Sequence, residues 1–174
     1  MEGKAVSKKT LGNLLIAIEN LILDVCSNVI LILLALLVIV IGANVMTRYI
    51  FNYTIPWAYE LGIYIFIYIV YIGTALGVAQ DTHVKIDFLV NKLKNIPRII
   101  VISLNYLILI LMSLFMLFYG TKESIAKWEN TGPIIKWIPL GVIYFAVALC
   151  GYLSFIFCVT SIFKFFDSKE KHKI

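Results

Sequence analysis

Four stretches of the chain are long, apolar and free of charged residues. They cover residues 25–47, 61–80, 99–121 and 137–163. A helix rises about 1.5 Å per residue, so about 20 apolar residues cross the roughly 30 Å hydrocarbon core of a bilayer. At this length in lipid, only a helix satisfies all of its own backbone polar groups. The sequence therefore predicts an all-α integral membrane protein with four transmembrane helices.

The composition leaves no room for a soluble domain beside these stretches. Hydrophobic residues make up 61% of the 174 residues and charged residues only 14%, whereas soluble domains contain about 25% charged residues. We therefore expect residues 1–174 to form a single membrane domain. The net charge is +5, and the lysines and arginines behind it flank the apolar stretches. This distribution favours membrane lipid as a partner and disfavours nucleic acid.

Lysine and arginine lie mostly on one side of the predicted topology. The N-terminal segment, the connection between the second and third stretches and the C-terminal tail hold most of these residues. Because short cytoplasmic loops carry the excess of Lys and Arg, both the N-terminus and the C-terminus are predicted to be cytoplasmic. The first stretch continues to Arg48 without a small-residue cleavage site, so we interpret it as a span and not as a signal peptide.

Two further segments show the spacing of amphipathic helices. Residues 4–22, before the first span, place leucine and isoleucine at helical intervals, and residues 84–96, between the second and third spans, do the same. Both are predicted to lie in the cytoplasmic interface, with their lysines near anionic lipid. An ordinary helix packed against the transmembrane helices explains the same spacing.

The residues that usually mark transport pathways or catalysis are missing from the spans. The four stretches hold no Asp, Glu, Lys, Arg or His, whereas ion and solute pathways within membranes use such groups. His83 and His172 lie outside the spans, so a haem anchor would lack its axial ligand. Cys26, Cys150 and Cys158 form no CxxC pair and are expected to be buried as small hydrophobic residues. We expect no enzyme activity, no cofactor and no metal site.

The second span has two distinct sides on a helical wheel. One side holds an acid and three tyrosines: Glu60, Tyr64, Tyr68 and Tyr71. A tyrosine hydroxyl within hydrocarbon needs a hydrogen-bond partner, so this side should face protein. The opposite side holds Gly73 and Gly77, a GxxxG spacing that lets another backbone approach closely. We expect this helix to lie between its own bundle and a partner, although packing within the chain alone explains both sides.

Four motifs around this helix resemble a known family. The first span ends in Arg48-Tyr49-Ile50-Phe51-Asn52, the second begins with Pro56-Trp57-Ala58-Tyr59-Glu60, Gly73 lies within it, and His83-Val84-Lys85-Ile86-Asp87 follows. In this order they resemble the small membrane (Q) subunit of TRAP transporters, the tripartite ATP-independent periplasmic family. The likeness covers roughly residues 38–93, and the remainder matches in hydropathy.

The resemblance implies a division of labour within a transporter of the bacterial inner membrane. A large polytopic membrane subunit would hold the carboxylate and sodium sites, and a periplasmic solute-binding protein would deliver the solute by transient docking. This chain would be the scaffold that braces the large subunit. Members of the family transport dicarboxylates, sialic acids and other organic acids, so the resemblance leaves the solute open.

Several motif residues are candidates for the partner interface or for structural roles. Arg48 and Glu60 bracket a short turn and are spaced to form an ion pair, and Trp57 is placed as an interfacial anchor. His83 and Asp87 lie four residues apart, as in a helical contact. The full candidate set is Arg48, Tyr49, Phe51, Asn52, Trp57, Glu60, Tyr64, Tyr68, Tyr71, Gly73, Gly77, His83 and Asp87.

Two other classes of protein fit the same pattern. One is an independent four-helix membrane protein, such as a sensor or assembly factor, that self-associates through Gly73 and Gly77. The other is the membrane anchor of an enzyme complex, which the positions of the histidines disfavour. A stable complex with a much larger polytopic protein would distinguish the transporter subunit from the self-associating protein.

Overall fold

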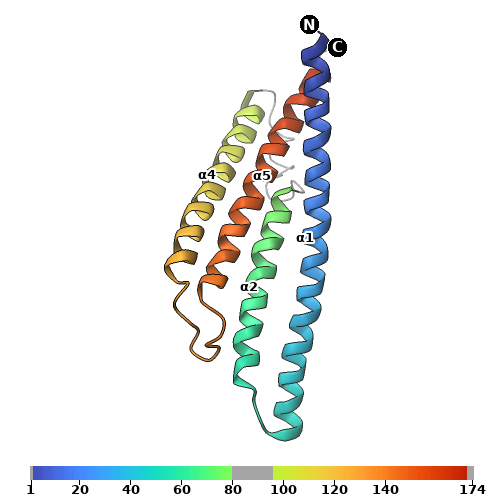
Figure 1. Ribbon diagram of the computed structural model, residues 1–174. Helices are drawn as coiled ribbons and strands as arrows, with labels where there is room; N and C mark the ends of the chain where they lie inside the picture. Colours follow the sequence, from blue (N-terminus) through green and yellow to red (C-terminus); the bar gives the residue numbers. More distant parts are fainter. Residues whose placement is uncertain (1, 80–95, 172–174) are drawn as a thin grey trace.

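Four long helices make up the part of the chain that the structure describes. This computed structural model describes residues 2–79 and 96–171, with the side chains of 16–79, 101 and 103–162. The helices are α1 (Glu2–Phe51), α2 (Pro56–Ala79), α4 (Ile96–Ala126) and α5 (Gly141–Lys171) (Figure 1). Each contains a stretch long and apolar enough to cross a membrane. The prediction of an all-α protein with four transmembrane helices is confirmed.

α1 is a single unbroken helix of 50 residues. At about 1.5 Å per residue it is about 75 Å long, more than twice the thickness of the hydrocarbon core. The sequence predicted an interfacial helix over 4–22 and a separate span over 25–47, but no proline interrupts residues 2–51, so the hydrogen-bond ladder continues from one to the other. The interfacial position of residues 4–22 stays a prediction. The second interfacial segment, 84–96, lies outside the described residues except for Ile96, which begins α4.

The four helices form an open row in the order α4, α5, α2 and α1 (Figure 1). α4 packs along α5, α5 packs against α2, and α2 packs against α1. α5 also touches α1, whereas the described part of α4 contacts neither α1 nor α2. The most apolar 18-residue stretch of α1 has none of its residues buried. The row therefore leaves broad apolar helix faces uncovered.

α4 and α5 approach each other most closely where two glycines face the opposite backbone. A Cβ built at Gly120 would lie 2.6 Å from the backbone nitrogen of Ala148, and one at Gly151 would lie 2.5 Å from that of Leu117. Such distances to backbone atoms leave no room for a side chain, so these glycines set the separation of the two helices. The GxxxG spacing predicts close approach at Gly73 and Gly77 instead, and no motif within one helix marks Gly120 and Gly151.

The buried core lies mainly between α2 and α5. Its residues are Ala75, Val78, Cys150, Phe157 and Cys158, and Ile22, Leu23 and Met116 are among the partly buried side chains that pack against them. Cys150 and Cys158 are buried as predicted, whereas Cys26 is only half-buried. All three cysteines carry free thiols.

Candidate functional site: the Glu60 clamp and the open side of α2

The turn from α1 to α2 is held by two asparagines and a proline. Asn52 follows α1 with a φ of 49°, a left-handed conformation that asparagine tolerates and that often ends a helix. The Oδ1 atom of Asn44 accepts a hydrogen bond of 2.9 Å from the backbone N–H of Ile55. Pro56 then begins α2, where its fixed φ suits the first helical position. The asparagine that ends the first motif and the proline that begins the second therefore both shape this turn.

The loop from α4 to α5, residues 127–140, lies at the same end of the molecule as this turn (Figure 1), which we call the hairpin end. The loop folds back on itself through an isolated β-bridge between Thr131 and Pro139. At its base, the N–H of Leu140 donates to the carbonyl of Asn130 at 2.7 Å, and the N–H of Gly141 donates to that of Lys127 at 3.1 Å. These bonds close the base of the loop but leave its middle to another partner.

The carboxylate of Glu60 holds the middle of the loop. Its Oε2 atom accepts hydrogen bonds from the backbone N–H groups of Ile134 at 3.0 Å and Ile135 at 2.8 Å, and the Tyr64 hydroxyl donates to Oε1. Glu60 is only 6% exposed. A Cβ at Gly132 would overlap the Glu60 and Tyr64 oxygens, so any larger residue there would displace these two side chains. We call Glu60, Tyr64 and the two N–H groups the Glu60 clamp.

The ion pair suggested between Arg48 and Glu60 is absent from the described side chains. Both carboxylate oxygens of Glu60 are engaged by Tyr64 and by the loop, while Arg48 is exposed near the end of α1. Backbone N–H groups carry no signature in a sequence, whereas Arg48 is a basic side chain close to Glu60 along the chain, so the sequence favours the wrong partner. The Gly132-Pro133 dipeptide was the available sign of a tight loop at this point.

The tyrosine side of α2 faces the rest of the molecule. Besides Tyr64 in the clamp, the Tyr68 hydroxyl donates a hydrogen bond of 2.6 Å to the carbonyl of Val142 on α5. Tyr71, one turn further along, packs against the buried core. The Tyr68 hydroxyl therefore fastens α2 to the start of α5, whereas the Tyr64 hydroxyl bonds within α2 to Glu60, the residue that holds the loop.

Replacing Tyr68 with phenylalanine should lower the free energy of unfolding by about 0.5–1.5 kcal/mol, the usual net value of one hydrogen bond. Thermal unfolding in detergent would measure the change. Tyr59→Phe is the matched control, because Tyr59 is exposed on the same helix. Equal stabilities for the two variants would show that the bond to Val142 contributes nothing.

The opposite side of α2 is uncovered. Ile63, Phe66 and Val70 are exposed, and among the described residues no neighbouring atom lies within 4 Å of a Cβ built at Gly73. We call Ile63, Phe66, Val70 and Gly73 the open stripe, whose members follow one another at intervals of three or four residues. Gly77 continues this spacing and is half-buried.

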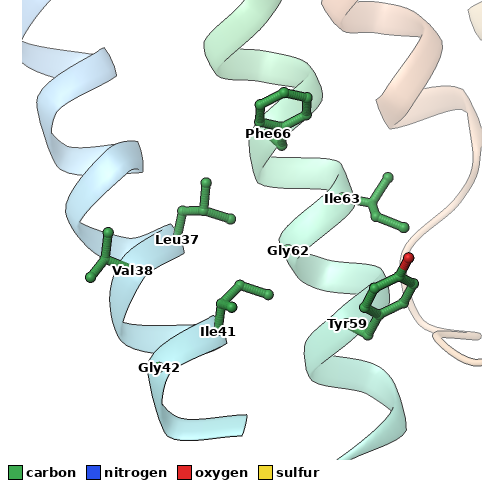
Figure 2. Close-up of a pocket in the computed structure, with 8 residues that line it drawn as sticks. All are labelled: Leu37, Val38, Ile41, Gly42, Tyr59, Gly62, Ile63 and Phe66. Atoms are coloured by element: carbon green, nitrogen blue, oxygen red, sulfur yellow. The ribbon is translucent and has the colours of Figure 1, made fainter. Parts of the chain in front are cut away.

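An apolar groove runs between α1 and α2 beside the open stripe (Figure 2). Its volume is about 550 Å³, and it is lined by Leu37, Val38, Ile41, Gly42, Tyr59, Gly62, Ile63 and Phe66. At Gly62 the two helices touch, because a Cβ there would lie 2.6 Å from Cδ1 of Ile41. At Gly42 no described neighbour lies within 4 Å of such a Cβ. The groove is thus open where α1 carries a glycine.

The remaining candidate residues do not join the clamp. Tyr49 and Phe51 are exposed at the end of α1, and Trp57 is exposed at the start of α2. His83 and Asp87 lie outside the described residues. The structure also reveals a buried acid outside the candidate set: Glu19 of α1 is only 1% exposed, although it lies in the segment predicted to be interfacial.

These features define a class of protein. The chain is a multi-pass helical membrane protein whose helices form an open row, and its clamp fastens a loop to α2. Its uncovered faces are suited to lipid or to another membrane protein. A family model, described as the DctQ component of tripartite ATP-independent periplasmic transporters, matches residues 37–167, more than half of the chain, so the chain belongs to this family.

Two curated relatives agree with this family. A TRAP transporter small permease protein of Haemophilus influenzae is 29% identical over 128 residues, which cover 74% of this chain and 79% of the relative. The C4-dicarboxylate TRAP transporter small permease protein DctQ of Vibrio cholerae is 41% identical over 49 residues, only 28% of this chain and 21% of the relative. The chain is a small TRAP transporter subunit of a bacterial inner membrane, as the motif resemblance implied.

Proposed function

We propose that the chain is the scaffold of a sodium-coupled TRAP transporter that imports an organic acid. In this proposal a large polytopic subunit holds the sodium and solute sites, and a periplasmic solute-binding protein delivers the acid. Membership of the family supports the existence of such partners. The excess of Lys and Arg on one side favours cytoplasmic termini and a periplasmic hairpin end.

The open row is the observation that carries the scaffold role. A four-helix protein that works alone usually packs its helices around a closed core. Here α4 has α5 as its one neighbour among the described helices, and the apolar stretch of α1 has no buried residue. Such an arrangement suits a chain that lies along a larger membrane protein and stiffens it.

The polar groups inside the spans support the absence of a solute path in this chain. The hydroxyls of Ser113, Ser124 and Thr160 donate to backbone carbonyls of the chain itself, and Glu60 is held in the clamp. A transport site needs groups that exchange partners with the solute or ion. Groups already bound within the fold stabilise it instead.

The first test is the recovery of a tagged chain from detergent-solubilised native membranes, followed by mass spectrometry. We expect one large polytopic membrane protein in near-equal amount, and the purified pair should take up an organic acid in a sodium-dependent manner. Recovery of the chain alone would contradict the scaffold role. Sodium-independent uptake would contradict the proposed coupling to sodium but would not contradict the scaffold role.

Gly73→Leu should weaken the association with the large subunit about tenfold while leaving the fold intact. The substitution fills the open stripe, and an overpacked contact costs about 1–3 kcal/mol. Within the described chain nothing lies close enough to clash. Copurification with the large subunit is the measurement. Ser103→Leu, on an exposed part of α4, is the matched control; equal recovery for both variants would exclude the open stripe as the contact.

The open stripe also fits a second function, self-association of an independent membrane protein. In that case the chain alone would form a dimer in detergent, and Gly73→Leu would convert the dimer to a monomer. A monomeric wild-type chain that recovers a large partner would exclude this alternative.

A further inference from the structure

The α4–α5 loop lies deeper in the molecule than the turn between α1 and α2. Figure 1 shows that the loop ends beside α2, short of the α1–α2 turn. The middle of the loop is bonded to Glu60, which is two residues from Gly62, the point of contact with Ile41 of α1. Arg48 follows Ile41 by seven residues, about 10 Å along the helix. Glu60 lies two residues, about 3 Å, nearer the hairpin end than Gly62. The middle of the loop therefore lies about 7 Å further inward than Arg48, the charge that ends the first apolar stretch.

Several side chains at this depth are apolar and uncovered. On α1, Ala43 and Val45 are exposed close to the level of Glu60. On the loop itself, Ile134 is 48% exposed and Trp137 is 73% exposed. Exposed apolar residues at the level of an uncharged helical stretch are solvated by lipid and not by water. A large apolar side chain such as Trp137 would be costly to leave in water.

Irregular backbone at this depth needs an internal partner for its N–H groups, because lipid offers none. Carbonyls of the loop itself accept hydrogen bonds from the N–H groups of Leu140 and Gly141. The carboxylate of Glu60 accepts those of Ile134 and Ile135. A loop in water would not need a buried carboxylate, since water would accept these hydrogen bonds. The Glu60 clamp is therefore the device that allows this backbone to lie at the membrane boundary.

We propose that the α4–α5 loop is immersed in the membrane interface, with phospholipid as the partner of its outer surface. Ile134 and Trp137 insert at the boundary between headgroups and acyl chains, where the amphipathic indole ring is favoured. The exposed Lys136 reaches lipid phosphates. Glu60 satisfies the backbone from the inner side. The inference depends neither on the identity of the large subunit nor on which side of the membrane the hairpin end faces.

Tryptophan fluorescence tests this position directly. The chain has three tryptophans, and Trp57→Phe with Trp128→Phe leaves Trp137 alone. The variant is reconstituted, with any membrane partner that copurifies, into nanodiscs of phosphatidylethanolamine and phosphatidylglycerol brominated near the top of the acyl chains. We expect Trp137 to lose most of its emission to the brominated lipid and little to aqueous iodide. A chain that retains only Trp57, which is exposed at the start of α2, provides the comparison from the other loop of the hairpin end.

Two outcomes would overturn the inference. Quenching by iodide without quenching by brominated lipid would place Trp137 in water. Protection from both quenchers would mean that protein, either the large subunit or a second copy of this chain, covers the loop. The position of Trp137 is read without altering the clamp, so the test stands even if variants of Glu60 fail to fold.

Discussion

Glu60→Ala is expected to release the α4–α5 loop and to give the largest change of any single substitution at the hairpin end. The variant removes the acceptors of the Ile134 and Ile135 N–H groups and of the Tyr64 hydroxyl. These donors then find partners only if the loop moves out to water. Hydrogen exchange of a peptide covering 127–140 should accelerate about tenfold or more, since local protection follows local opening.

Two further variants make the result specific to the clamp. Glu60→Gln keeps one carbonyl oxygen that can accept from both N–H groups. The exchange rate of the peptide 127–140 in this variant should therefore lie between the rates in Glu60→Ala and in the wild type. Glu123→Ala removes a half-buried acid of α4 near the same end and should leave the loop protected. If the loop of Glu60→Ala exchanged at the wild-type rate, other contacts would have to hold the loop in place.

Gly151→Leu is expected to prevent α4 and α5 from packing and therefore to abolish the folded chain. Even a Cβ would lie 2.5 Å from the backbone nitrogen of Leu117 and 2.9 Å from the carbonyl oxygen of Ser113. Overpacking of this kind costs about 1–3 kcal/mol for a small group and more for a large one. Among the described helices α4 has no other neighbour to hold it.

Thermal unfolding and size-exclusion chromatography in detergent would measure this loss. Gly151→Ala should lower the melting temperature, and Gly151→Leu should yield no monodisperse peak. Gly73→Leu introduces the same side chain into a span where no described atom is close, so it should elute as wild type does. A wild-type melting temperature for Gly151→Ala would mean that α4 and α5 can accommodate a methyl group at this point.

The four spans could be predicted because the hydropathy of a segment indicates whether it lies in lipid or in water. The ends of the helices could not be predicted in this way. α4 continues through Lys122 and Glu123 to Ala126, since a helix extends into the polar interface beyond its apolar part. α5 begins at Gly141, although the uncharged stretch begins at Trp137. Residues 137–140 belong to the loop, where Pro139 forms the bridge to Thr131. Polarity alone contains no information on such local hydrogen bonding.

The contacts of the candidate site were harder to predict than the spans. Glu60 and the tyrosines could be placed on one side of a helix from spacing, but their partners are N–H and carbonyl groups of distant residues. The GxxxG spacing drew attention to Gly73, whereas close approach occurs at Gly120 and Gly151. These two glycines lie on different helices, so no spacing within one segment could reveal that they face the same interface.

The order of helices in the row has a consequence for the biosynthesis of the chain. α1 and α2 are neighbours both in sequence and in space, and so are α4 and α5. α5 is also the helix that joins the two pairs, through its packing against α2. During translation each pair can form as its second helix enters the membrane. The two halves can unite only after the last helix has been inserted, so a chain interrupted before α5 would hold the α1–α2 pair and an unpaired α4 until it is degraded.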